Sequence, residues 1–212
     1  MAVKRRRRRA SGLGIIFVLL LAGCTYAVPM NTVVPDFGIS TKVPLRATVL
    51  IPETLSSYVI KGIPHGFAGS AQTFEFPLGA ELEKATRQAL GQVFQQVHVV
   101  RERPSPKDVE VLVEPEIISF QFWFEFGGAA VSKIRLKVTM TDGTVRVWTR
   151  ETESPEERSR PRFVSFDMDV AQGEAASKAL VSALKEIASE AAKAPELWKL
   201  ADKVTTAKKY RR

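Results

Sequence analysis

Hydrophobic and polar residues alternate along two long stretches near the middle of the chain. Even-numbered apolar residues mark positions 118–126, and a second alternating run covers positions 134–140. A period of two places one set of side chains on each face of a strand, so both stretches are predicted to be half-buried β-strands. Before Pro115 the apolar positions are odd-numbered, as at Val111 and Val113. The switch predicts a bulge or break near Pro115, because only an extra residue lets a strand change faces.

Weaker patterns complete the predicted order of elements. Further strands are predicted at 45–51, 57–61, 98–101, 109–113 and 164–170. Apolar residues repeat with a helical period at 79–96, at 172–193 and in a short segment at 196–207. This order predicts an α+β fold: a two-layer sandwich in which an antiparallel meander sheet carries two amphipathic helices on one face.

The dipeptide Asp142-Gly143 lies between two alternating runs, which favours a hairpin with a two-residue turn. That turn places Thr141 opposite Thr144 and Met140 opposite Val145. This register, together with a second turn at Gly127-Gly128, predicts that basic residues and two tryptophans share the outer face of the sheet, away from the helices. The members of this predicted face are Trp123, Lys133, Arg135, Lys137, Arg146, Trp148 and Arg150.

Two interpretations of this outer face stay open. It is a candidate partner-binding surface for lipid phosphates, peptidoglycan carboxylates or an acidic protein. Alternatively, it is an ordinary solvated face whose cations stack on the indole rings.

The first 24 residues have the three parts of an export signal. Residues 4–9 are all basic, residues 13–22 are apolar, and the sequence ends in Leu21-Ala22-Gly23-Cys24. The apolar run is too short for a membrane span, which needs about 20 residues. The final tetrapeptide resembles a bacterial lipobox. The resemblance implies cleavage between Gly23 and Cys24 and a lipid anchor with palmitate-type acyl chains on Cys24.

The alternative is an uncleaved signal anchor followed by an ordinary buried cysteine. Residue 25 bears on the destination of the lipidated form. Aspartate at that position retains lipoproteins in the inner membrane in enterobacteria-like sorting, so Thr25 favours the outer membrane, with the domain facing the periplasm.

The chain therefore divides into a signal peptide (1–23), an extended Pro-containing tether (24–44), a single α+β domain (45–207) and a basic tail (208–212). The net charge of +8 comes mostly from the signal peptide. Without residues 1–23, 25 basic residues face 23 acidic ones. We therefore expect no nucleic-acid partner, because a basic stripe would have to survive processing.

No residue constellation indicates catalysis, a cofactor or a metal. The two histidines, His65 and His98, lie far from any cysteine or carboxylate at ligand spacing. Cys24 is the only cysteine, so no intramolecular disulfide can form. The pair Glu114 and Glu116 flanks Pro115 and is better interpreted as a solvated strand end than as an acid–base pair. We expect a protein that is not an enzyme and has no cofactor.

The order of these elements is similar to that of the YajG-like bacterial lipoproteins. The similarity covers roughly residues 21–207 and rests on the lipobox, the helix after the first strand, the alternating strands with a tight hairpin and the Ala-rich final helix. It implies an outer-membrane lipoprotein with an α+β domain. The Pro-containing segment 52–77 is longer than that pattern predicts.

Three functions stay open on this basis. The first is a lipid-anchored, non-catalytic module that binds or assembles a periplasmic partner, either an envelope protein, peptidoglycan or an anionic lipid. The second is an accessory lipoprotein subunit of an envelope transport or lipopolysaccharide-export machine. The third is a hydrolase whose site has no recognisable motif. The sequence leaves the oligomeric state undetermined.

Overall fold

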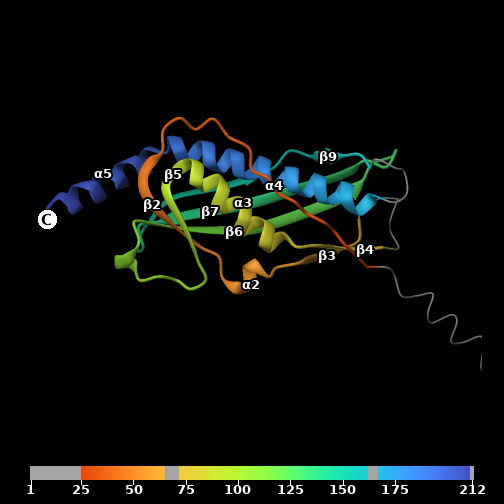
Figure 1. Cartoon of the computed structure of the whole chain (residues 1–212), viewed down its shortest axis with the longest axis horizontal. Coiled ribbons are helices and arrows are strands. Elements are labelled where there is room, and N and C mark those ends of the chain that lie inside the picture. The colour runs from red at the N-terminus through yellow and green to blue at the C-terminus, as the bar shows by residue number, and fades with distance from the viewer. Residues whose placement is uncertain (1–24, 65–71, 162–166, 211–212) are drawn as a thin grey trace, which may run out of the picture.

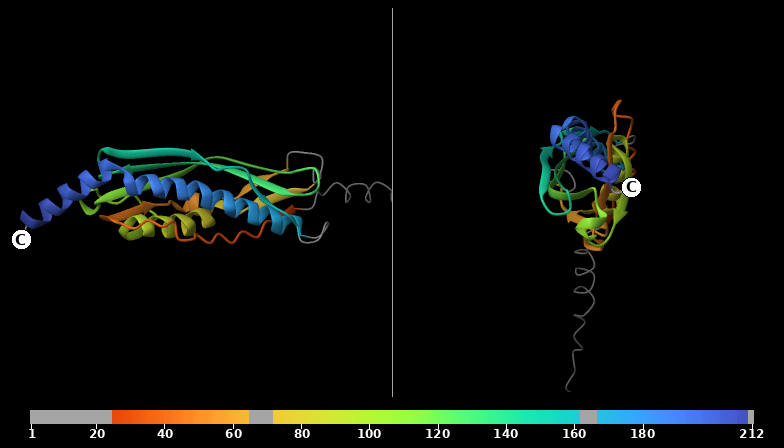
Figure 2. Two further views of the ribbon diagram at one scale, coloured as in Figure 1. Left: turned by 90° about the horizontal axis from the view of Figure 1, so that it is seen from above. Right: turned by 90° about the vertical axis from the view of Figure 1, so that its left-hand side faces the viewer.

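The structure, a computed structural model, describes residues 25–64, 72–161 and 167–210. It is elongated, with helices α3 (Leu78–Val93) and α4 (Met168–Lys193) lying along one face of a large sheet (Figure 1). The first described residues and the C-terminal helix α5 (Pro195–Tyr210) lie at opposite ends of the long axis (Figure 2). No helix within the described ranges is long and apolar enough to cross a membrane.

The large sheet has the strand order β5-β2-β6-β7-β8, and a short strand, β9, pairs with the first residues of β7. Strand β2 is parallel to both of its neighbours, whereas the other pairs are antiparallel. The strands are β2 (Val43–Leu50), β5 (Phe94–Val100), β6 (Val111–Phe124), β7 (Ala130–Thr141), β8 (Arg146–Glu153) and β9 (Glu157–Ser159).

A small sheet of order β1-β4-β3 lies at the end where the described chain begins. Its strands are β1 (Thr25–Ala27), β3 (Ile60–Gly62) and β4 (Thr73–Phe76), and the short elements elsewhere are helix α2 (Glu53–Ser56) and the 3-10 turn Pro106–Asp108. The sequence analysis predicts no strand between the segment 57–61 and the helix that begins near residue 79, so β4 was not predicted.

The main hydrophobic core lies between the large sheet and the helices. Leu82 of α3, Leu180 and Leu184 of α4, and Val138 and Met140 of β7 are all buried in it. Alanines at many of the remaining sheet-facing positions of α4 keep that helix close to β7. The predicted α+β sandwich with two amphipathic helices on one face is confirmed.

A second hydrophobic cluster fills the end that carries the small sheet. Phe74 and Phe76 of β4 pack against Phe122 and Phe124 of β6, with ring centroids 4.7–6.0 Å apart. Ala175 and its neighbours in the first turns of α4 close the cluster. One long hairpin, β6–β7, therefore carries both clusters.

A bulge lets β6 serve both clusters. The pairing with β7 shifts between Ile117 and Ser119, which leaves Ile118 as the extra residue. Odd-numbered residues such as Val113 face the helices before the bulge, and even-numbered ones such as Phe122 face inward after it. The predicted change of face is confirmed, three residues beyond Pro115.

Three predictions about elements are wrong. The sheet is not a pure antiparallel meander, because β2 lies between two parallel partners. Met168 to Val170 form the first turn of α4 rather than the end of a strand, and residues 162–166 lie outside the described part of the chain. The last helix does not end at residue 207, where the basic tail was predicted to begin: α5 continues to Tyr210, and the Lys208 ammonium lies 2.7 Å from the Glu110 carboxylate.

The predicted tether (24–44) does not extend away from the domain. Residues 28–42, which we call the strap, have no regular secondary structure but lie across the helices. The Thr32 N–H donates to Glu81 of α3 over 2.8 Å, and the Phe37 N–H donates to Gln92 over 2.7 Å. Phe37 also packs against the main core. Polar side chains of α3 satisfy the strap's backbone groups, which a periodicity analysis of the strap cannot detect.

The β7–β8 connection has four residues rather than two, which moves the register of β8. The Asp142 carboxylate accepts the Thr144 N–H over 3.0 Å and the Val145 N–H over 2.8 Å. Gly143 adopts a φ of +94°, a left-handed conformation that suits glycine. The longer loop alone shifts the pairing by two residues, so Arg146 lies opposite Thr141 and stays on the outer face. A bulge then leaves Val147 as an extra residue, and Met140 lies opposite Trp148 instead of Val145. The shift beyond the bulge is odd, which sends the β8 side chains from Trp148 onward to the other face.

The contact between the strap and α4 gives a matched pair of glycine substitutions. A Cβ on Gly173 would lie 2.1 Å from the Pro29 carbonyl oxygen of the strap, whereas a Cβ on Gly91 of α3 would meet nothing within 4 Å. Gly173→Ala should therefore lower the free energy of unfolding by about 1–3 kcal/mol, as overpacking does. Gly91→Ala should raise it by about 0.5–1 kcal/mol through helix propensity. Urea denaturation measures both, and equal stabilisation would show that the strap is not seated on α4.

The β7–β8 loop gives a pH-dependent prediction. The Val145 N–H, together with Thr144, lowers the pKa of Asp142, against the opposing effect of burial. The ionised carboxylate should therefore stabilise the fold above the ordinary aspartate pKa of about 3.9, and this stabilisation should be lost as the pH falls through the lower folded-state pKa. At pH 7, Asp142→Ala should cost about 1 kcal/mol of unfolding free energy.

Urea denaturation at neutral and acidic pH checks the loop prediction. The deficit of the Asp142→Ala variant should shrink on acidification, while Asp202→Ala, at an exposed position of α5, should change little at either pH. A deficit that stays constant down to about pH 2 would contradict the role assigned to the carboxylate.

Candidate functional site

The structure divides the predicted basic face between the two sides of the sheet. Trp123, Lys133, Arg135 and Lys137 stay on the outer side, where Lys133 lies opposite Gln121 and Arg135 lies opposite Glu153. Arg146 is exposed at the start of β8. The changed register of β8 turns Trp148 and Arg150 toward the helices, so the seven residues do not form one surface.

The two displaced residues have structural contacts on the helix side. Trp148 lies opposite Met140 and packs against the main core. The Arg150 guanidinium lies 2.7 Å from Glu186 and 2.8 Å from Glu190, both on α4. A hydrogen bond from Thr152, with that from Arg150, lowers the pKa of Glu186. These contacts attach the edge of the sheet to α4.

Three of the four cations that remain on the outer side have a carboxylate partner. Lys133 lies 2.7 Å from Glu153, Lys137 lies 3.4 Å from Glu116, and Arg135 pairs with Glu151. A two-residue turn would have set Arg150 opposite Arg135, whereas Arg150 lies opposite Val138. Arg146 is the cation of the predicted face on this side that forms no ion pair within the described residues.

Several sequence predictions lie outside the described residues. These are the signal peptide, the cleavage position between Gly23 and Cys24, the lipid on Cys24 and the loop that contains His65. Within the described ranges, no group of three or more histidine, cysteine, aspartate or glutamate side chains could hold a metal ion.

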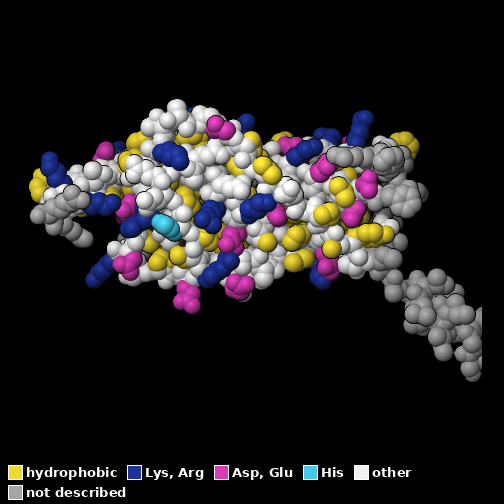
Figure 3. All heavy atoms as spheres, viewed as in Figure 1, with side chains coloured by type: hydrophobic (Ala, Val, Ile, Leu, Met, Phe, Trp, Pro, Cys, Tyr) yellow, Lys and Arg dark blue, Asp and Glu magenta, His cyan; other side chains and the backbone are white. Residues whose placement is uncertain are grey.

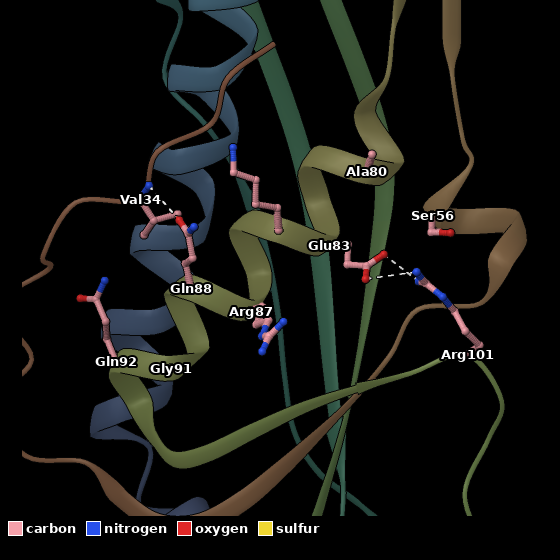
Figure 4. Close-up of a pocket in the computed structure, with 10 residues that line it drawn as sticks. Val34, Ser56, Ala80, Glu83, Arg87, Gln88, Gly91, Gln92 and Arg101 are labelled. Atoms are coloured by element: carbon pink, nitrogen blue, oxygen red, sulfur yellow. Dashed lines mark hydrogen bonds and ion pairs between the residues drawn. The ribbon is translucent and has the colours of Figure 1, made fainter.

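An open groove runs along the outer side of α3. Its volume is 960 Å³, and its walls are the strap at Val34, helix α2 at Ser56, and Arg101 just after β5 (Figure 4). A smaller hollow of 320 Å³ continues it between α3 and β5, with Val97, His98 and Val99 on the β5 side. We call the two together the α3–β5 groove.

Charged side chains line the α3–β5 groove, and one of them has no carboxylate partner. Glu83 of α3 accepts two hydrogen bonds from Arg101, of 2.7 and 3.2 Å, and this pairing raises the pKa of Arg101. Arg87, one turn further along α3, lines both hollows and is exposed. Within the described chain it forms no ion pair, so its charge is available to a ligand.

Strand β5 forms the floor of the smaller hollow and one open edge of the large sheet. It pairs with β2 on one side, and no described strand pairs with its other side. The Val100 carbonyl accepts the Ile51 N–H on the β2 side. Because backbone groups alternate along a strand, the N–H and C=O groups of Val97 and Val99 point to the open side.

The two edges of the large sheet differ in charge. Strand β8 contains two arginines and two glutamates, residues that oppose the addition of another strand. Strand β5 has the sequence FQQVHVV, with no lysine, arginine, aspartate, glutamate or proline. Exposed His98 is visible on this side of the molecule, among lysine and arginine side chains (Figure 3). The β5 edge is therefore the one that is open to strand addition.

Sequence reasoning missed the α3–β5 groove for two reasons. It extended the first helix to residue 96, whereas α3 ends at Val93 and β5 begins at the next residue. It also assumed an antiparallel meander, in which β5 would have had a neighbour on each side. The lack of charged residues from Phe94 to Val100 was the available signal.

Comparisons with known proteins identify a solved structure with a similar fold. No family model matches the chain, and no curated protein matches it. A Xanthomonas campestris protein of family DUF330 has a similar structure, with a TM-score of 0.50 and 15% identity over 89% of this chain and 99% of that one.

Two further solved structures match more weakly. A candidate lipoprotein from Caulobacter crescentus has a TM-score of 0.39 and 12% identity over 54% of this chain and 80% of that one. A Helicobacter pylori protein described as a neuraminyllactose-binding hemagglutinin homologue has a TM-score of 0.42 and 14% identity over 82% of this chain and 100% of that one. At 15% identity the Xanthomonas campestris structure shows a shared fold only, and the two structures with TM-scores below 0.5 support no argument.

Proposed function

We propose that this chain is a lipid-anchored, non-catalytic lipoprotein of the bacterial envelope, held at the outer membrane through Cys24 and facing the periplasm. We further propose that it binds an extended segment of a partner envelope protein along β5. The observation that carries the second proposal is the unpaired edge of β5, which has no charged residue and lies beside the α3–β5 groove.

The anchor rests on the sequence. The basic run, the short apolar run and Leu21-Ala22-Gly23-Cys24 have the order that lipoprotein processing needs. A single acyl chain binds a membrane only marginally, so the several chains of a bacterial lipoprotein provide the stable attachment.

The mode of binding follows from the backbone of β5. A strand added to an open edge gains main-chain hydrogen bonds, and the pockets beside it select alternate side chains. At β5 the available groups are those of Val97 and Val99, and the adjacent hollow between α3 and β5 can receive every second side chain.

The charge of the groove indicates the chemistry of the partner. Arg101 forms an ion pair with Glu83, whereas Arg87 has no carboxylate partner in the described chain. A bidentate guanidinium–carboxylate pair is among the stronger side-chain contacts. The partner segment is therefore expected to carry an aspartate or glutamate at a position that reaches Arg87.

Replacement of the lipidated cysteine tests the anchor. Cys24→Ser should leave a full-length precursor that incorporates no labelled palmitate, because the diacylglyceryl group needs a thiol. Metabolic labelling followed by electrophoresis measures both properties. Thr25→Asp is the matched variant: it should still incorporate palmitate but fractionate with the inner membrane. Labelled palmitate on Cys24→Ser would contradict the assignment of the anchor.

A photocrosslinking residue at His98 tests the partner site in intact cells. His98 is exposed on β5, so a reactive side chain there should form an adduct with a partner protein. Arg87→Glu should reduce the adduct roughly tenfold, as the loss of one charged contact worth about 1.4 kcal/mol would. Gln96→Lys should also reduce the yield of the adduct, because a lysine on an edge strand opposes the addition of another strand.

The same residue at Thr149, exposed on the charged edge strand β8, is the control and should form no such adduct. Adducts of equal yield at His98 and Thr149 would mean that β5 is not a specific site. An adduct whose mass is twice that of the chain would identify a second copy as the occupant and contradict the proposed partner.

A further inference from the structure

Exposed apolar side chains gather at the end of the domain where the described chain begins. Tyr26, Ile63, Phe126 and Val170 are all exposed, and they come from four different segments. These segments are β1, the residue after β3, the β6–β7 turn and the first turn of α4. We call this set the apolar tip; hydrophobic side chains are visible at this end in Figure 3.

Strand register places the members of the tip at one level. Thr25 of β1 lies opposite Thr73, and Tyr26 lies opposite Phe74. On the other side of β4, Gly62 lies opposite Phe74, so Ile63 reaches the level of Thr25.

The other two members are fixed to the same end by the second hydrophobic cluster. The ring of Phe124 lies 5.9 Å from that of Phe74, and Phe126 follows two residues later. Ala171 of α4 packs in the same cluster, next in sequence to Val170.

Phe126 is presented by a turn that holds it away from the core. Gly127 and Gly128 have φ values of +101° and +84°, conformations that glycine adopts without strain. The Glu125 N–H donates to the Ala129 carbonyl over 2.9 Å, which closes the turn. An ordered turn that leaves a phenylalanine fully exposed is unusual for a surface that faces only water.

Two of the carboxylates beside the tip are neutralised, whereas Asp169, next to Val170, forms no ion pair within the described residues. Glu125 lies 2.8 Å from Arg158, and Glu75 lies 2.6 Å from Lys61. Neither acidic side chain therefore presents an unpaired negative charge to the phosphates of a lipid headgroup.

The chain itself indicates what covers the tip. Cys24 is bonded directly to Thr25, and one residue spans at most about 3.6 Å. Since β1 begins at Thr25 and pairs with β4, no free spacer separates the described fold from the lipid-bearing residue. Acyl chains on Cys24 would hold this end of the domain at the bilayer surface.

We propose that the apolar tip inserts into the interfacial layer of the bilayer that holds the Cys24 lipid. This inference rests on the proposed lipid anchor. Tyrosine and phenylalanine are suited to that layer, and apolar side chains there lie about 5–10 Å below the headgroups. The long axis of the domain then stands away from the membrane, with α5 at the distal end.

The opposite end of the β6–β7–β8 meander offers a matched control. Val145, in the β7–β8 turn, is also an exposed apolar residue. It lies at the other end of β7 from the β6–β7 turn and is followed by exposed Arg146. A membrane contact confined to the apolar tip should leave Val145 in water.

An environment-sensitive thiol label tests the inference in the full-length, processed chain. Cys24 is the only cysteine, so its lipid-blocked sulfur leaves no reactive thiol, and a cysteine introduced by Phe126→Cys, Ile63→Cys or Val145→Cys becomes the single labelling position. Each variant is labelled with a nitrobenzoxadiazole dye and reconstituted in phosphatidylethanolamine–phosphatidylglycerol vesicles with and without doxyl-labelled lipid.

Labels at positions 126 and 63 should shift to shorter wavelength in vesicles and lose roughly half or more of their emission to the doxyl lipid, as groups at interfacial depth do. The label at 145 should show neither change. If the labels at 126 and 63 behave as the one at 145 does, the tip does not touch the bilayer and the inference is wrong.

The unsubstituted chain separates this failure from failure of the anchor. It should take up no dye, because the Cys24 thiol is consumed by the lipid. Absence of dye on the unsubstituted chain together with unquenched labels at 126 and 63 overturns only the tip inference. Uptake of dye by the unsubstituted chain overturns the proposed anchor and, with it, the tip inference.

Discussion

The pairing of β6 with β7 is the constraint on which the rest of the structure depends. This hairpin runs between the two ends of the domain and presents apolar side chains to both hydrophobic clusters. It can do so because Ile118 is inserted as an extra residue, which turns the even-numbered phenylalanines inward beyond the bulge. Without that bulge, either Val113 or Phe122 would face water. The helices, the small sheet and the strap all pack on a surface that this one irregularity makes continuous.

The same hairpin gives the domain two different ends. Its β6–β7 turn carries Phe126, beside the strand that begins at Thr25, whereas β7 leads to the charged β7–β8 turn at the other end. The strap fastens the N-terminal segment along α3 and α4, through hydrogen bonds such as the one from Thr32 to Glu81. A lipid at Cys24 and a partner at β5 would therefore be connected by a rigid body rather than by a flexible tether.

Sequence reasoning succeeded where short-range patterns decide the structure. The alternation in β6 and β7 and the helical stripes of α3 and α4 depend on neighbouring residues, and the bulge follows from a change of parity within one strand. It failed where one long-range choice outweighs the local pattern. A longer Asp142-Gly143 loop followed by a bulge at Val147 sent Trp148 and Arg150 to the other face. The strap is held by hydrogen bonds from its backbone to side chains of α3, and such contacts leave no periodic pattern in the sequence of the strap.

The candidate site was missed for a related reason. An open edge is a property of the sheet order, and the parallel pairing of β2 with β5 joins segments about 50 residues apart in the sequence. Amide hydrogen exchange on the purified chain, resolved to single residues, tests the account most directly. The amides of Val97 and Val99 should exchange several orders of magnitude faster than those of buried strand residues such as Val138, because they have no acceptor on the open side. Equal protection of Val97, Val99 and Val138 would show that the β5 edge is already covered, and it would contradict the proposed site.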